Sequence, residues 1–101
     1  MSGKDPSIVQ LVAALPMRER SWVLVDHWEA DLFAIGVGRK GDERRLVYIS
    51  TFKRAPGRYD YECETPSGPE LTDFDTTEEG EDVGIDELVR AMVRHLAPRG
   101  R

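Results

Sequence analysis

RRLVYISTFKRAPGRYDYECE, residues 44–64, contains the two clearest strands of the chain and the turn that joins them. Residues 44–52 are rich in β-branched and aromatic side chains, which favour strands. The KRAPG sequence that follows has the proline and glycine that are typical of turns. Residues 58–64 alternate strictly between two faces, so one of these faces is expected to be buried. That face consists of Tyr59, Tyr61 and Cys63.

Two further strands are expected before this pair. Residues 21–27, SWVLVDH, have the composition of a strand, and residues 31–37, DLFAIGV, place their apolar side chains on one face. The polar GRKGDE sequence that follows is the kind of connection found in hairpins. Short turns between consecutive strands favour an antiparallel meander. A short edge strand at DFD, residues 73–75, would extend this meander to five strands.

Two amphipathic helices are expected at the ends of the chain. In residues 7–15, SIVQLVAAL, apolar side chains recur at the spacing of one helix face. Ser7 is the expected N-cap of this helix, and Pro16 ends it. A longer apolar stripe runs through residues 85–96, with Gly84 as the expected N-cap and acidic residues in the first turn.

These elements follow one another in the order α-β-β-β-β-α. Each helix has an apolar face that must be buried, and one face of the sheet can cover both. We therefore predict an α+β fold with an antiparallel sheet of four or five strands and two helices packed on one face. The 101 residues are expected to form a single domain, with flexible termini at residues 1–6 and 98–101.

The charge of the chain is strongly polarised. The net charge is −5, but residues 59–89 contain twelve of the nineteen acidic residues and no Lys or Arg, which gives this segment −12. The other seven acids share the rest of the chain with all fourteen bases, which leaves +7 there. The bases are densest in residues 39–58. Polarised charge influences association and the choice of partner rather than the fold.

We predict that the acidic segment is a binding surface for a basic protein, because like charges at this density repel each other and cost stability unless they are used. One alternative is a solvated connector that also caps the last helix. Another is a calcium loop that starts at Asp75, in which Gly80 fits the pattern but Thr77 and Asp86 do not. The predicted partner-binding residues are Asp60, Glu62, Glu64, Asp73, Asp75, Glu78, Glu79, Glu81 and Asp82.

The cluster Asp26, His27, Glu29 and Asp31 is the other group of reactive side chains. A His flanked by carboxylates can bind a metal ion or act as a general base, so a small metal-dependent hydrolase is an alternative function. A polar turn between two strands explains the same residues, because one His without a second motif is weak support for a site. Cys63 is expected to be a small buried hydrophobe. We therefore assign no catalytic residue, metal or cofactor.

Nucleic-acid binding is not expected. Tyr48 and Phe52 interleave with basic residues, as stacking and phosphate contacts would require, but the pI is about 5.0 and the acidic segment would repel phosphate. Pairing of Arg44 and Arg45 with the outward acids of the next strand is a simpler use of these bases. A homodimer or other homo-oligomer is a further alternative, with the acidic segment of one copy against residues 39–58 of another.

The sequence predicts a cytoplasmic protein that does not interact with membranes. One cysteine cannot form an internal disulfide and fits a reducing compartment. The N-terminal MSGKDPSIVQ lacks the basic region and apolar stretch of a signal peptide. No apolar run approaches the roughly 20 residues that span a bilayer.

The runs ADLFAIGV and RLVYISTFKRAPGRYDYECE, together with the last helix, resemble small, stand-alone bacterial α+β proteins of uncharacterised type. Some proteins of this size and layout are immunity proteins that neutralise a cognate toxin. The resemblance covers residues 22–64 and the last helix, rests on the texture of the strands and transfers no functional residue. It implies a non-enzymatic inhibitor that presents carboxylates to a basic active site and associates fast through charge complementarity.

Overall fold

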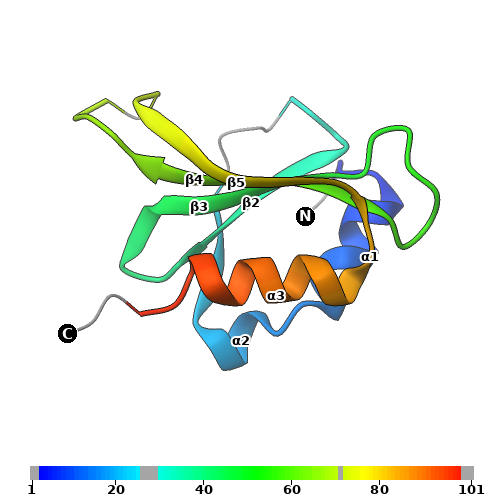
Figure 1. Ribbon diagram of the computed structural model, residues 1–101. Helices are drawn as coiled ribbons and strands as arrows, with labels where there is room; N and C mark the ends of the chain where they lie inside the picture. Colours follow the sequence, from blue (N-terminus) through cyan, green and yellow to red (C-terminus); the bar gives the residue numbers. More distant parts are fainter. Residues whose placement is uncertain (1–2, 26–29, 71, 99–101) are drawn as a thin grey trace.

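The computed structural model describes residues 3–25, 30–70 and 72–98, and these residues form a two-layer α+β fold (Figure 1). An antiparallel sheet of five strands forms the upper layer, and the three helices of the described residues lie below it. The strands lie side by side in chain order, which confirms the predicted meander in its five-stranded form. None of these helices has the length and apolar character needed to cross a membrane. The elements are α1 (Pro6–Ala14), α2 (Met17–Arg20), β1 (Trp22–Val25), β2 (Ala34–Arg39), β3 (Asp42–Ser50), β4 (Tyr59–Pro66), β5 (Phe74–Val83) and α3 (Ile85–His95).

The core lies between the sheet and the helices. The inward face of β4 is buried as predicted, and Val47 and Ile49 of the neighbouring β3 are completely buried beside it. From below, α3 contributes a stripe that includes Leu88 and Met92, both without exposed surface. Each aliphatic side chain buried in this way stabilises the fold by about 1.5–3 kcal/mol. The two helices with apolar stripes are therefore held on one face of the sheet, as the sequence predicts.

The first helix begins earlier than predicted because Asp5, and not Ser7, is its N-cap. The Asp5 carboxylate accepts a hydrogen bond from the Ser7 backbone amide at 2.9 Å. Pro6 occupies the first helical turn, where backbone N–H groups have no partner within the helix. The missing N–H of proline therefore costs no hydrogen bond. Pro16 follows the end of α1 as expected, but it also caps α2, a four-residue helix that was not predicted. Gly84 is the N-cap of α3, as predicted.

The acidic run forms an edge strand of ten residues, much longer than the short edge strand expected at residues 73–75. The ten residues of β5 pair with β4, and β5 ends the sheet on that side. Two register shifts each place an extra β5 residue opposite β4, which is the pattern of a β-bulge. At the shift nearer to α3, Asp82 adopts a φ of 54°, and its amide donates to the Asp60 carboxylate at 2.8 Å.

Gly80 allows the ring of Tyr61 to lie against β5. The two residues are cross-strand partners on the buried side of the sheet. A Cβ added at Gly80 would lie 2.4 Å from Cε1 of Tyr61, which is closer than any real contact of this kind. Tyr61 is only 4% exposed, so its ring has little room to move.

We expect Gly80→Ala to lower the free energy of unfolding by about 1–3 kcal/mol, because the added methyl group must displace a buried ring. Urea unfolding followed by circular dichroism measures the loss. Thr76→Ala, at an exposed position of the same strand, is the control and should change stability by less than about 0.5 kcal/mol. Wild-type stability of Gly80→Ala would show that the ring and the strand are not closely packed.

Candidate protein-binding surface

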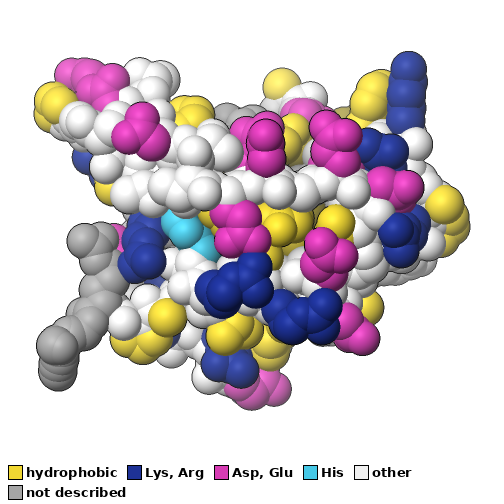
Figure 2. Space-filling view, viewed as in Figure 1, with side chains coloured by type: hydrophobic (Ala, Val, Ile, Leu, Met, Phe, Trp, Pro, Cys, Tyr) yellow, Lys and Arg dark blue, Asp and Glu magenta, His cyan; other side chains and the backbone are white. Residues whose placement is uncertain are grey.

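The structure divides the predicted acidic residues between the two sides of the sheet. Glu62 lies on the outer side, away from the helices, because it alternates with buried residues of β4, and its β5 partner Glu79 lies there too. Glu78 lies on the helix side, because it is the partner of the buried Cys63. Figure 2 shows acidic side chains along the upper, sheet layer, while Lys and Arg gather below it and at the right-hand end. The nine predicted residues therefore do not form one continuous surface.

Two of the predicted acids are paired with bases of the turn before β4. The Asp60 carboxylate accepts a hydrogen bond from Nε of Arg54 at 2.9 Å, and the Asp82 carboxylate accepts one from Nε of Arg58 at 3.0 Å. Arg58 also donates to the Asp82 carbonyl oxygen. Exposed pairs of this kind contribute little stability, but they reduce the charge that these two acids offer to a partner.

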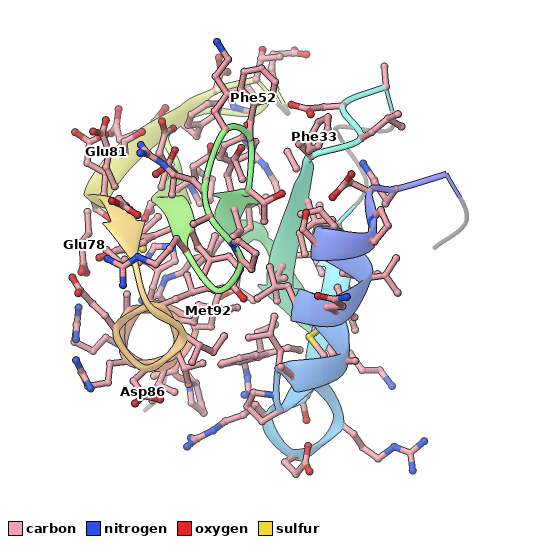
Figure 3. All side chains as sticks on the ribbon, turned by 90° about the vertical axis from the view of Figure 1, so that its right-hand side faces the viewer. Phe33, Phe52, Glu78, Glu81, Asp86 and Met92 are labelled. Carbon is pink, nitrogen blue, oxygen red and sulfur yellow. The ribbon has the colours of Figure 1, made fainter. Side chains whose placement is uncertain are left out.

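Glu78 is used within the fold. Its Oε2 accepts hydrogen bonds from the Tyr61 hydroxyl at 3.0 Å and from Arg94 of α3 at 2.6 Å. Figure 3 shows Glu78 beside α3, whereas Glu81 and Phe52 rise from the upper side of the sheet. Glu78 therefore joins β5 to the helical layer and does not belong to the outer acidic surface.

Arg44 does not pair with the outward acids of β4, contrary to the sequence-based expectation, and no ion pair of Arg45 is found in the described part of the chain. Arg44 instead donates to the backbone carbonyl oxygens of Glu70 and Asp73. The Asp73 carboxylate accepts the Glu70 amide at 3.1 Å. These bonds fix the connection between β4 and β5, so Asp73 has a structural role, while Asp75 is exposed on the same hairpin.

The outer side of the sheet carries a hollow with a volume of about 210 Å³, in which carboxylates and aromatic rings occur together. Phe52, one of the residues that line this hollow, is 54% exposed. Partial burial and then the charge of Asp31 raise the pKa of the Tyr48 hydroxyl, with further increases from Glu62 and Asp60. Both desolvation and nearby negative charges disfavour the ionised form of a phenol. The hollow is lined by Tyr48, Ser50, Phe52, Asp60, Tyr61, Glu62, Glu79, Gly80 and Glu81.

Asp60 at this hollow is paired with Arg54, but the other carboxylates that line it have no ion pair in the described part of the chain. These are Glu62, Glu79 and Glu81. Glu62 and Glu79 are direct cross-strand partners, and like charges in this arrangement are destabilising. We name Asp60, Glu62, Glu79 and Glu81, with Tyr48 and Phe52, the outer acidic hollow.

Glu64 is the buried member of the predicted set. It is only 5% exposed and lies between Leu46 and Thr76 in the sheet. Burial, and then the charge of Glu62, raise the pKa of the Glu64 carboxyl to about 7. The carbonyl oxygen of Glu64 lies 2.9 Å from Nε2 of His95, whose pKa is lowered chiefly by burial. Glu64 is therefore poorly placed to meet a partner directly.

The other candidate sites have no support in the structure. Of the cluster at residues 26–31, positions 26–29 lie outside the described residues, so the hydrolase alternative stays a prediction. No group of three or more His, Cys, Asp or Glu side chains in the described ranges is arranged to hold a metal ion. The calcium-loop interpretation is wrong, because the pattern from Asp75 to Asp86 forms a strand and the start of a helix, and strand side chains alternate between opposite sides.

Cys63 is buried, as the alternation of β4 predicts. Burial, and then the charge of Glu78, raise the pKa of its thiol to about 12. The thiolate is the nucleophilic form of cysteine, so Cys63 is unreactive at neutral pH.

Tyr48 and Phe52 are the residues of the outer acidic hollow that the sequence analysis did not assign to a protein partner. Their place among basic residues had indicated only a stacking role with nucleic acid. Tyr48 alternates with the buried Val47 and Ile49, so the parity of β3 is the signal that would have placed it on the outer side with Glu62.

Comparisons of the chain with protein-family models, with curated proteins and with solved structures found no match. The function is therefore argued from the charge and shape of this surface.

We expect Glu64→Gln to stabilise the protein at pH 8 by an amount of the order of 1 kcal/mol, with little effect near pH 4. The pKa of this carboxyl is about 7 in the folded protein against an ordinary value of 4.5. The folded state therefore binds the proton more tightly, and this contribution to stability is complete below pH 4.5 and is lost as the pH rises through 7. Urea unfolding at both pH values measures the difference.

Glu43→Gln is the matched control, because Glu43 is an exposed strand residue and this change should affect stability by less than about 0.5 kcal/mol at either pH. A Glu64→Gln effect of the same size at pH 4 and pH 8 would show that the side chain acts through packing and not through its proton.

Proposed function

We propose that this chain is a non-enzymatic binding protein of the inhibitor or immunity type, which engages a basic protein partner in the cytoplasm through the outer acidic hollow. The observation that carries the proposal is the like-charge pair of Glu62 and Glu79, which are cross-strand partners without a counter-ion among the described residues. A cation from a partner would turn this repulsion into attraction.

The aromatic side chains support the same ligand. A Lys or Arg side chain is attracted to the face of an aromatic ring, and a carboxylate adds charge-assisted hydrogen bonds. Phe52 already has the Nζ of Lys53 at 5.3 Å from its ring centroid. Phe33 packs on Phe52 edge to face, with 5.5 Å between the ring centroids, and supports the ring from behind. Aromatic anchors in a partly enclosed site are typical of interface hot spots.

The polarised charge also fits a fast-binding inhibitor. Charge complementarity steers two proteins toward the productive encounter and raises the association rate, most strongly at low salt. The twelve acids of residues 59–89, without any Lys or Arg, would provide this field. Three of these acids are neutralised by Arg54, Arg58 and Arg94, whereas Glu62, Glu79 and Glu81 on the outer side of β4 and β5 take part in no ion pair among the described residues.

We expect Glu79→Lys to raise the free energy of unfolding of the isolated protein by about 0.2–1 kcal/mol, because an opposite charge then faces Glu62. The same change should abolish capture of the basic partner. Immobilised wild-type and variant proteins are incubated with lysate of the source organism, and bound proteins are identified by mass spectrometry after washes at low and high salt.

Glu43→Lys is the matched control, because it makes the same change of charge at an exposed position in the β2–β3 hairpin. The proposed partner is a basic protein that is held by wild type and Glu43→Lys, released by high salt and lost with Glu79→Lys. A set of captured proteins that is identical for all three baits would refute the role of the hollow.

A further inference from the structure

β5 is the longer of the two edge strands in the described part of the sheet, with ten residues against four in β1. β5 pairs with β4 on one side, and no strand of the described residues lies on its other side. Among the described residues, side-chain hydrogen bonds to its backbone fall only on Asp82, at its end. Figure 2 shows a strip of white atoms, which are backbone and uncharged polar groups, across the middle of the molecule where Figure 1 places β5.

An open strand edge presents N–H and C=O groups that can pair with another chain. The helical layer packs beneath the sheet, with α3 against β3 and β4, and it reaches β5 through the ion pair of Arg94 with Glu78. Two bulges divide β5 into two regularly paired stretches, Phe74–Thr76 and Glu78–Gly80. Glu81 follows the second stretch, at the start of the register shift. An added strand that pairs along Glu78–Gly80 would therefore lie beside the outer acidic hollow.

The charges beside this edge select the occupant. Glu79 and Glu81 rim the outer side of the strand, and both are exposed. Residues two apart in a strand point to the same side, so an added strand meets this pair with its own alternate side chains. A second copy of β5 would bring carboxylates against carboxylates, which is repulsive. A strand with Lys or Arg at every second position is complementary.

We infer that the open edge of β5 binds an extended segment of the partner protein, with Lys or Arg at alternate positions, by adding it to the sheet as a further strand. This inference rests on the proposed function, since it describes how the basic partner is held. Backbone pairing with β5 supplies affinity, and the side chains that reach Glu79 and Glu81 supply selectivity.

The test uses two synthetic peptides as long as β5, both acetylated, amidated and alternating Lys with Thr. One is unmodified and the other is methylated at every backbone nitrogen, so that the charge is the same but no ladder hydrogen bonds can form. Binding to the full chain is measured by calorimetry at low salt, and amide exchange of residues 78–81 is followed by NMR. The Glu79→Gln/Glu81→Gln variant is compared with Glu19→Gln/Glu43→Gln, which loses the same charge at exposed positions far from β5.

We expect the unmodified peptide to bind about tenfold or more tightly than the methylated one and to slow amide exchange at residues 78–81. This binding should weaken in Glu79→Gln/Glu81→Gln and persist in the control. Equal affinity of the two peptides would overturn strand addition while leaving a purely electrostatic basic partner in place. Binding of neither peptide would also overturn it, as would self-association of the chain that protects the same amides without peptide.

Discussion

The alternation of β4 buries its aromatic and thiol side chains against the helices, and this single constraint determines where the charge of the protein lies. Because neighbouring residues of a strand point to opposite sides, burying Tyr61 forces Glu62 outward. β5 must then pair with a strand whose outer side is already negative. Its bulges shift the register so that Glu78 turns toward α3, where Arg94 neutralises it. On the outer side, Glu62, Glu79 and Glu81 take part in no ion pair among the described residues.

The sequence predicted those elements whose periodicity indicates which face is buried. The strict alternation of β4, the apolar composition of β3 and the stripe of α3 each indicate a face that must be covered, and the structure covers all three. β5 has no such signal, because Val83 at its end is its only buried residue. It forms a strand because β4 offers an unpaired edge. Pairing with a separate strand cannot be inferred from the local sequence alone. The cap of α1 was misplaced for a smaller reason, since Asp5 and Ser7 are both good capping residues.

The sequence showed that acidic residues are concentrated in one segment, but not which of them are exposed and which are paired with bases. Charge can be counted without a structure, so the excess of acids in residues 59–89 was evident. Which of them are neutralised depends on bases brought in by the fold, such as Arg94, which lies sixteen positions from Glu78 in sequence. The aromatic wall of the hollow was overlooked because Tyr48 belongs to the basic part of the chain. Only the register between β3 and β4 places it beside Glu62.

The unpaired carboxylates of the outer acidic hollow and the open edge of β5 can be understood together. A ten-residue edge strand invites pairing with another copy of itself, and natural proteins commonly prevent this with charged side chains and bulges. β5 has both devices, but its charge has one sign, so it repels identical copies without repelling every strand. A basic segment meets no such barrier and gains attraction from the groups that exclude self-association. Specificity of this kind has a cost, because the free protein keeps a repulsion between like charges that a more stable sequence would lack. In this structure, that repulsion lies between the cross-strand partners Glu62 and Glu79.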